Sequence, residues 1–246
     1  MNQSLDYILT YLFDKDRYQL SLMAIDSALK ERVGNLIRNG FPPQYLIGGC
    51  EFLGEDLIIT PGTFIPRPET EPLVEHILNH GRYKTGLEIG VGSGAIAIGL
   101  LTKEKDLFMI GTETSPIAIE TCFFNLKVRD LFGRMVLILT SRIDIFKEAS
   151  FDLIVSNPPY IPTRILSRLP LRVRYEPRVA IDGGDDGLVV VEEILTVATD
   201  LLRSGGLLAL EIDPLISPKV RDLSSAFDFK IYKDYRGQDR YLIGVR

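Results

Sequence analysis

Beyond Lys84, short apolar runs alternate along the chain with segments of helical periodicity. Five runs have the length and composition of buried strands, namely Thr85–Ile89, Leu107–Thr112, Met135–Thr140, Phe151–Ser156 and Leu207–Ile212. The helical patterns between them lie near Gly94–Thr102, Pro116–Arg129 and Leu188–Arg203. Because consecutive parallel strands need a crossover connection, this alternation predicts an α/β fold with a mostly parallel sheet covered by helices on both faces.

Two further apolar runs lie near the end of the sequence, at Phe229–Lys233 and Tyr241–Val245. The segment between them, Asp234–Asp239, is too short for a crossover helix. The two runs are therefore predicted to pair as an antiparallel hairpin. Added to the five parallel strands, this hairpin gives a seven-stranded sheet.

Helical periodicity also marks the start of the sequence, in Leu5–Leu12 and again in Leu29–Ile37. Asn39–Pro43 then supplies a capping glycine and two prolines that prevent a helix from continuing. We therefore divide the chain into a short helical region at 1–41, a hairpin and linker at 42–83, and a main domain at 84–246.

The linker region combines three patterns. Between Tyr45 and Thr60, glycines separate short apolar runs, which predicts a hairpin. The following segment, Pro61–Glu71, is too rich in proline for regular structure. A helix is predicted from Pro72 to about His80, since proline is favoured in the first turn.

The composition is that of a globular protein, with 246 residues of which 46% are apolar and 25% charged. A formal net charge of −5 argues mildly against binding of nucleic acid by general phosphate neutralisation. No apolar stretch reaches the length of a membrane-spanning helix, and Met1–Tyr7 lacks the features of a secretory signal. We therefore expect a cytoplasmic protein without membrane association.

Neither the cysteines nor the histidines predict a metal site. Cys50 and Cys122 lie far apart in the sequence and match no metal-ligand or redox spacing, which favours two buried thiols. His76 and His80 have the i, i+4 spacing of a metal pair, but no H-E-x-x-H core or other ligand accompanies them, which favours a solvated helix.

A glycine-rich turn connects the first strand of the predicted sheet to the next helix. Gly90, Gly92 and Gly94 permit a tight turn in which backbone amides approach a ligand at the helix N-terminus. The spacing also satisfies the dinucleotide form G-x-G-x-x-A, and a structural turn is a further alternative. Glu113, at the end of the next strand, can accept hydrogen bonds from both ribose hydroxyls of an adenosine cofactor, or can cap the next helix. Since both positions follow the carboxyl ends of strands, they should meet in one crevice, which favours a nucleoside cofactor.

Asn157-Pro158-Pro159-Tyr160 follows another strand directly. Two consecutive prolines remove two backbone donors and hold the neighbouring carbonyl oxygens rigidly. With the Asn157 amide and the Tyr160 ring, this corner suits a planar group that carries an NH₂. The alternative is a turn that merely ends the strand.

Five segments together resemble a known family, and they are Pro43–Gly48, Phe64–Glu71, Leu87–Ala97, Asn157–Pro162 and Tyr175–Gly184. Over about residues 42–246 the chain resembles the peptide chain release factor N5-glutamine methyltransferases of the HemK/PrmC type. The glycine motif is shared by most S-adenosylmethionine-dependent methyltransferases, and Asn-Pro-Pro-Tyr also occurs in enzymes that methylate amino groups of nucleic acids. The specific part is Ile-Pro-Arg-Pro-Glu-Thr-Glu, at 65–71.

The resemblance implies a Rossmann-like class I fold that uses S-adenosyl-L-methionine and releases S-adenosyl-L-homocysteine. It implies transfer of a methyl group to the side-chain amide of the glutamine in the GGQ motif of a release factor, so that a protein, not a nucleic acid, is the expected partner. Two features depart from the family, which usually has an aromatic residue in place of Ile145 and a longer helical domain in place of 1–41.

By resemblance, the chemistry is carried by the corner residues Asn157, Pro158, Pro159 and Tyr160. The expected cofactor-binding residues are Glu88, Gly90, Val91, Gly92, Ser93, Gly94, Glu113, Asp144, Ile145 and Asn157. The expected substrate-binding residues are Asn157, Pro158, Pro159, Tyr160, Arg67 and Glu69. No metal ligand is expected.

Two other functions stay open on the sequence alone. One is an amino-methyltransferase that acts on a ribosomal-protein glutamine or on adenine in nucleic acid. The other is a non-catalytic adapter that keeps a cofactor-shaped fold, although an adapter would not need the intact Asn157–Tyr160 corner.

Arginines are concentrated after this corner. The segment 164–178 contains one acidic residue, Glu176, and five arginines, which are Arg164, Arg168, Arg172, Arg174 and Arg178. Because Pro170 interrupts the run, we expect a loop or broken helix beside the site. The segment is either a docking surface for an acidic partner or a solvated loop with scattered ion pairs.

Overall fold

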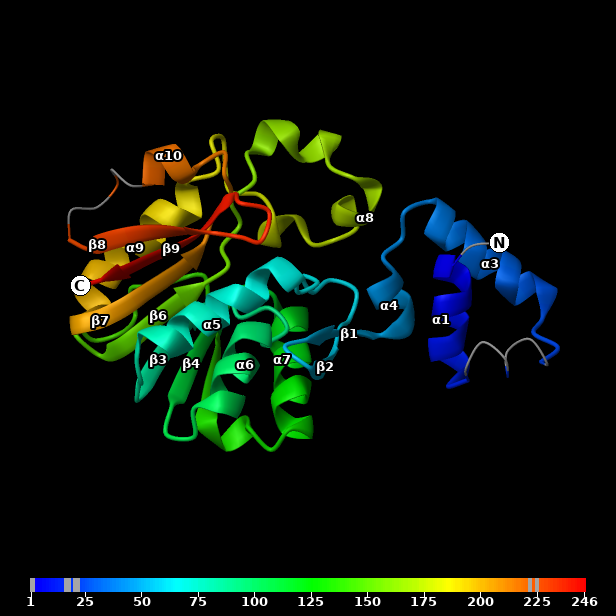
Figure 1. The fold of residues 1–246 in the computed structure, drawn as a ribbon, viewed down its shortest axis with the longest axis horizontal. Helices are drawn as coiled ribbons and strands as arrows, with labels where there is room; N and C mark the ends of the chain where they lie inside the picture. Colours follow the sequence, from blue (N-terminus) through cyan, green and yellow to red (C-terminus); the bar gives the residue numbers. More distant parts are fainter. Residues whose placement is uncertain (1–2, 16–18, 20–22, 221–222, 224–225) are drawn as a thin grey trace.

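A computed structural model describes residues 3–15, 19, 23–220, 223 and 226–246. Its main feature is a seven-stranded sheet with the order β5-β4-β3-β6-β7-β9-β8 (Figure 1). The strands are β3 (Thr85–Ile89), β4 (Phe108–Glu113), β5 (Met135–Leu139), β6 (Phe151–Ser156), β7 (Leu202–Glu211), β8 (Asp228–Lys233) and β9 (Asp239–Val245). The first five run parallel, and β9 pairs antiparallel with both β7 and β8. The predicted fold class is confirmed.

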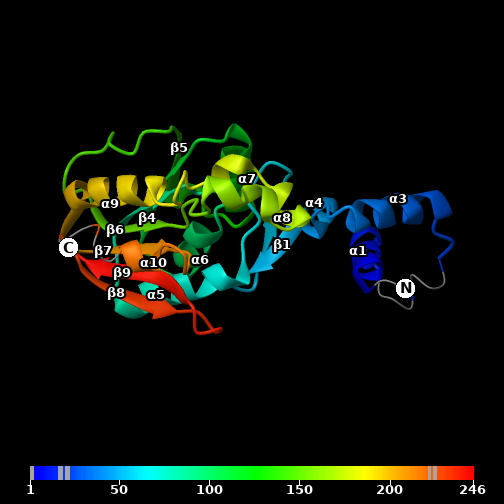
Figure 2. The ribbon, with the colours of Figure 1, turned by 90° about the horizontal axis from the view of Figure 1, so that it is seen from above.

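Helices cover both faces of this sheet. On one face lie α5 (Glu71–His80), α6 (Ala95–Lys103) and α7 (Pro116–Val128), and on the other lies α9 (Val189–Leu201). Figure 2 shows α5 and α9 on opposite sides of the strands. In the central strand β6, Leu153 and Val155 join one core while Ile154 joins the other, since successive side chains point to opposite faces.

The N-terminal part contains α1 (Gln3–Phe13) and α3 (Ser27–Arg38), which stand apart from the sheet in Figure 1. It connects through α4 (Pro43–Ile47) to a hairpin of β1 (Gly49–Phe52) and β2 (Glu55–Ile58). Met1 and Asn2, part of the segment tested for a secretory signal, lie outside the described residues. The three-part division of the chain stays a prediction.

The structure corrects the predicted start of the hairpin at Tyr45. Pro43 opens the short helix α4, and Gly48 in the left-handed region, at φ +76°, ends it, so Tyr45 is helical. The prolines that stop α3 thus also begin the next helix. The expectation that Pro61–Glu71 has no regular structure is also wrong, because Pro68–Thr70 forms a 3₁₀ turn, η1, directly before α5.

Two elements near the end of the main domain also differ from the prediction. Strand β7 starts at Leu202, directly after α9, whereas we predicted helix to Arg203 and strand from Leu207. The register of the pairing with β6 jumps from Leu202 to Leu207, and Gly205 within the jump has φ +79°. The residues of this irregularity are not apolar, so the sequence pattern did not reveal the first part of the strand. A short helix, α10 (Ser217–Val220), was not predicted.

The arginine-rich segment forms a broken helix, as expected. It consists of two 3₁₀ turns, η3 (Thr163–Arg168) and η4 (Arg178–Ala180), on either side of the single-turn helix α8 (Leu171–Arg174). In the part of the chain that the structure describes, no helix is long and apolar enough to cross a bilayer.

Candidate functional site

A cavity of about 220 Å³ lies at the carboxyl ends of the parallel strands. Its walls come from the segments after β3, β4, β5 and β6, and from the linker before α5. Of the predicted site residues, those that line it are Glu88, Gly90, Val91, Gly92, Ser93, Glu113, Asn157 and Pro159. The two motifs found in the sequence therefore share one cavity.

The glycine turn leaves space for a ligand. Gly90 and Gly92 have φ of +73° and +56°, and a Cβ at either position would meet no atom within 4 Å. The turn is held by Thr112 of β4, whose carbonyl accepts from the amides of Gly90 and Val91 at 2.9 and 3.0 Å. Gly94 differs, since its Cβ would lie 2.7 Å from Cys122 Sγ on α7. Close helix packing and a φ of +85° both favour glycine at position 94, and Gly94 does not line the cavity.

Glu113 stands at the cavity wall where β4 ends. One carboxylate oxygen accepts from the Gly92 amide at 2.9 Å, and the other accepts from the amides of Thr114 and Ser115 at 2.8 and 3.0 Å. The cap of α7 is Ser115, whose hydroxyl accepts from Ala118 at 3.3 Å. Glu113 is therefore not the helix cap, and its carboxylate is oriented by the glycine turn.

Glu88 is buried below the glycine turn, with 2% of its surface exposed. Its carboxylate accepts from the Ala97 amide in the first turn of α6 at 3.0 Å. Burial, together with the nearby charge of Glu113, raises the pKa of Glu88 well above its usual range. The residue links the end of β3 to α6 and helps fix the floor of the cavity.

The Asn157 corner is connected to two residues that the sequence analysis missed. Asn157 Nδ2 donates to Thr70 Oγ1 at 3.2 Å, and Thr70 Oγ1 donates to Glu211 Oε2 at 2.6 Å. The Tyr160 hydroxyl donates to Glu211 Oε1 at 3.0 Å. Pro158 and Tyr160 do not line the cavity, and the predicted stacking of a substrate on the Tyr160 ring stays a prediction.

Asp144 and Ile145 lie outside the cavity. Asp144 forms an exposed ion pair with Arg142 at 3.0 Å, which lowers the pKa of its carboxyl, and Ile145 is 45% exposed. The apolar side chain that does line this wall is Ile143, two residues earlier and only 7% exposed. The predicted contact of Asp144 and Ile145 with a cofactor stays a prediction.

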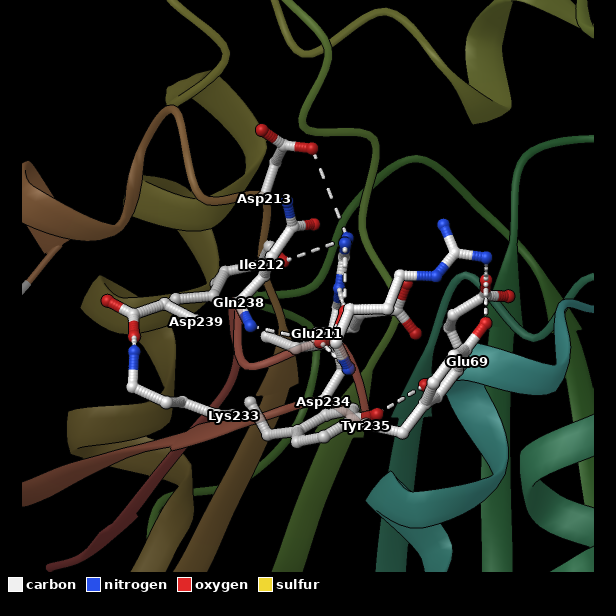
Figure 3. Close-up of polar contacts among 12 residues, drawn as sticks. Glu69, Glu211, Ile212, Asp213, Lys233, Asp234, Tyr235, Gln238 and Asp239 are labelled. Carbon is white, nitrogen blue, oxygen red and sulfur yellow. Dashed lines mark hydrogen bonds and ion pairs between the residues drawn. The ribbon is translucent and has the colours of Figure 1, made fainter.

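Arg67 directly precedes the 3₁₀ turn before α5, Glu69 lies within that turn, and neither residue lines the cavity. Arg67 forms an ion pair with the buried Glu176, which also accepts from the Ile65 amide at 3.0 Å. Glu69 accepts from the Tyr235 hydroxyl, at the tip of the β8–β9 hairpin, at 3.0 Å (Figure 3). Both side chains hold the linker in place, and their predicted contact with a substrate stays a prediction.

We expect Arg67→Ala to lower the free energy of unfolding by about 2–3 kcal/mol, because the Glu176 carboxylate would be left buried without its cation. Arg142→Ala is the matched control, since its pair with Asp144 is exposed and its loss should leave the free energy of unfolding nearly unchanged. Urea unfolding measures both. Equal stabilities for the two variants would contradict a structural role for Arg67.

Other lining residues were not named as site residues in the sequence analysis. They come from the linker, from the loop after β5, from the arginine-rich region and from α9, and they include Gly62, Phe64, Pro66, Thr140, Ser141, Pro177, Val179, Ala180, Val190 and Glu193. The carboxyl-end rule could have found Thr140 and Ser141, which directly follow β5. The linker residues reach the cavity only through the tertiary fold.

The two histidines differ in their exposure, and so do the two cysteines. His80 is exposed, as predicted, but the His76 ring packs on Tyr232 of β8 at 4.5 Å, so the solvated interpretation is wrong for His76. Burial lowers the pKa of His76. Cys122 is buried and Cys50 is only half-buried. The described residues include no group of three or more His, Cys, Asp and Glu placed to hold a metal ion.

All five arginines of the segment 164–178 are exposed. Arg178 pairs with Asp182 at 2.8 Å, and Arg164 donates to the Asp185 carbonyl at 3.3 Å. The other three form no ion pair with a described residue, and these are Arg168, Arg172 and Arg174. Because the single acid of the segment, Glu176, is buried against Arg67, the surface carries uncompensated positive charge beside the cavity.

Comparison with known proteins identifies relatives. The family model described as methyltransferase small domain matches residues 68–165. A release factor glutamine methyltransferase of Moorella thermoacetica is 39% identical over 214 residues, which are 84% of this chain and 76% of that protein. Another, of Aquifex aeolicus, is 34% identical over 252 residues, or 98% of this chain and 90% of that protein. The crystal structure of a methyltransferase from Pyrococcus furiosus matches the fold with a TM-score of 0.60 at 21% identity, over 87% of this chain and 98% of that chain.

Proposed function

Because the chain belongs to the release factor glutamine methyltransferase family, we propose that it transfers a methyl group from S-adenosyl-L-methionine to a glutamine side-chain amide of a peptide chain release factor. The observation that carries the proposal is the shared cavity, in which the glycine turn and Glu113 face the corner formed by Asn157 and Pro159. A cofactor and a planar amide can therefore meet in one place. We further propose that the protein acts in the cytoplasm, where release factors work.

The residues of the cavity fit the proposed cofactor. The open space above Gly90 and Gly92 admits a ligand close to the backbone, and the Glu113 carboxylate is an acceptor suited to ribose hydroxyls. The buried side chain of Ile143 gives an apolar wall suited to a purine ring. We assign cofactor binding to these residues and to Val91 and Ser93 beside them.

When bound, S-adenosyl-L-methionine supplies a methyl group already activated on a sulfonium. The amide nitrogen is a poor nucleophile, since its lone pair is delocalised, so the chain contributes orientation and electrostatic stabilisation. The Asn157 side-chain oxygen accepts from the substrate NH₂ and stabilises the positive charge that develops on nitrogen. In the net exchange, one N–H of the amide becomes N–CH₃ and a proton is released to solvent.

The test of this function is a methyl-transfer assay with radiolabelled S-adenosyl-L-methionine. A release factor, a ribosomal protein and an adenine-containing oligonucleotide are offered in parallel to the wild-type protein. We expect label in the release factor alone. Label in the oligonucleotide or the ribosomal protein would overturn the proposed substrate, and no label in any of the three would favour an adapter.

The uncompensated arginines suit docking of the intact release factor, since an acidic surface on that partner would be steered toward the cavity. We expect Arg168→Glu/Arg174→Glu to lower kcat/KM for a whole release factor about tenfold, mainly through slower association. Salt should lower the wild-type value as well. Methylation of a short glutamine peptide should change little.

The matched control reverses Lys103 and Lys105 to Glu, which gives the same change in net charge at the opposite end of the strands, before β4. This control should keep the wild-type kcat/KM on the release factor. Equal losses on peptide and intact protein in the arginine variant would show that these arginines support the fold or the cavity and do not serve docking.

A further inference from the structure

A directional chain of hydrogen bonds lies behind the Asn157 side chain. It runs from Asn157 Nδ2 to Thr70 Oγ1 over 3.2 Å, and from Thr70 Oγ1 to Glu211 Oε2 over 2.6 Å. The three residues come from the end of β6, the 3₁₀ turn before α5 and the end of β7. They are up to 141 positions apart in the sequence, so only the fold brings them together.

With Glu211 as a carboxylate, which can only accept, each bond in this chain has one direction. A threonine hydroxyl has a single proton, and in Thr70 that proton is given to the Glu211 carboxylate. Toward Asn157, Thr70 can therefore only accept, and the only donor of the Asn157 side chain is its NH₂ group. The amide nitrogen is thus turned toward Thr70, which turns the amide oxygen away from it.

The acid that sets this direction is held firmly. Glu211 is 1% exposed, and its second oxygen accepts from the Tyr160 hydroxyl at 3.0 Å. Burial raises the pKa of Glu211, although the two hydroxyl donors and the charge of Arg240 act in the opposite direction and favour the carboxylate. Arg240 itself pairs with Asp213 and Asp234 and donates to the Ile212 carbonyl, and these three residues are labelled in Figure 3.

Thr70 is fixed from both sides as well. It is 3% exposed, and its amide donates to the Arg67 carbonyl at 2.9 Å. The next support is Glu69, whose carbonyl accepts from the Tyr241 hydroxyl at 2.6 Å. The Ile-Pro-Arg-Pro-Glu-Thr-Glu segment therefore delivers one hydroxyl to the back of the Asn157 corner at a fixed place.

We propose that Thr70 and Glu211 are positioning residues that hold the Asn157 amide with its oxygen, and not its NH₂, facing the substrate. The proposal rests on the proposed function, in which that oxygen accepts from the glutamine NH₂. A flipped Asn157 would point its NH₂ group at the NH₂ group of the substrate glutamine, so two donors would meet. Its nitrogen would also lose the hydrogen bond to Thr70 Oγ1. This chain of hydrogen bonds thereby favours a substrate side chain that ends in an amide over one that ends in a carboxylate.

The first test compares two substitutions of Thr70. Thr70→Val removes the hydroxyl at nearly constant volume, and we expect kcat on a release factor to fall about 10- to 100-fold, because a misplaced acceptor loses the productive geometry. Thr70→Ser keeps the hydroxyl and should restore kcat to within about threefold of wild type. The Kd for S-adenosyl-L-methionine, measured by calorimetry, should stay unchanged in both.

The matched control is Thr121→Val, which removes another buried threonine hydroxyl, bonded to Thr60, Thr63 and the Ile117 carbonyl away from Asn157. It should lower Tm and leave kcat unchanged. If Thr70→Val and Thr121→Val both lower Tm and neither lowers kcat, Thr70 is structural and the proposal fails.

The second test measures the direction of the amide. Glu211→Gln replaces one of the two acceptor oxygens by an NH₂ group. When this NH₂ is turned to Thr70, Thr70 accepts from it and can donate to Asn157, which allows the Asn157 amide to flip. As a competitor we choose a release factor whose target glutamine is replaced by glutamate. We expect this competitor to inhibit Glu211→Gln at least about tenfold more tightly than it inhibits wild type, since a carboxylate would then meet an NH₂.

Each outcome separates the two claims. Wild-type protein that does not methylate the release factor would overturn the proposed function. Wild-type protein that does, together with full kcat in Thr70→Val or an unchanged inhibition constant in Glu211→Gln, would overturn the positioning role and leave the function intact.

Discussion

Replacing Asn157 by Ala is expected to lower kcat for methyl transfer by at least about 100-fold, while the Kd for S-adenosyl-L-methionine changes comparatively little. The side chain of Asn157 faces the cavity with its oxygen turned away from Thr70, so its loss removes an acceptor for the substrate amide. The interaction strengthens as positive charge develops on nitrogen, and for that reason the effect falls on kcat.

Rapid-mixing or steady-state kinetics with a release factor measure kcat, and calorimetry measures cofactor binding. The matched control is Asn79→Ala, which removes an exposed asparagine side chain on α5 and should keep wild-type kcat. Wild-type turnover in Asn157→Ala would remove the role assigned to the corner.

Replacing Glu113 by Ala is expected to raise the Kd for S-adenosyl-L-methionine about 10- to 150-fold, from the loss of charge-assisted hydrogen bonds worth about 1.5–3 kcal/mol. The carboxylate also orients the glycine turn through the Gly92 amide, so part of the loss reflects a less ordered turn. Glu120→Ala, which removes the same charge from the exposed face of α7, should leave Kd unchanged.

Calorimetry with S-adenosyl-L-methionine and with NAD decides this prediction. Equal affinity of Glu113→Ala and wild type for S-adenosyl-L-methionine would contradict the assignment of Glu113. Binding of NAD without binding of S-adenosyl-L-methionine would show that the glycine turn has been misassigned.

The sequence was sufficient where a functional residue follows directly from local pattern. Gly90 and Glu113 lie at the carboxyl ends of adjacent strands, and Asn157 follows a third, so the strand pattern alone brings these residues to one edge of the sheet. The terminal hairpin was likewise predictable, because no helix fits in its connection. In these cases neighbouring residues determine the position.

The sequence was insufficient where a residue acts through contacts distant along the chain. Thr70 meets Asn157 and Glu211 only after the linker folds over the sheet, and no periodicity encodes these contacts. Ile143, not Ile145, lines the cavity. Both are isoleucines in the loop after β5, and the sequence does not show which of them the loop conformation directs inward. Tyr45 was placed in a strand because the capping effect of Gly48 is visible only in its backbone angle.

The most direct test of the central claim is to locate the added methyl group. A release factor incubated with the wild-type protein and S-adenosyl-L-methionine is digested, and the peptides are fragmented in a mass spectrometer. We predict one methyl group on the side-chain nitrogen of the glutamine in the GGQ motif, absent when Asn157→Ala replaces the wild type. A methyl group on another residue, or an unmodified release factor beside methylated adenine in an oligonucleotide, would contradict the assigned chemistry.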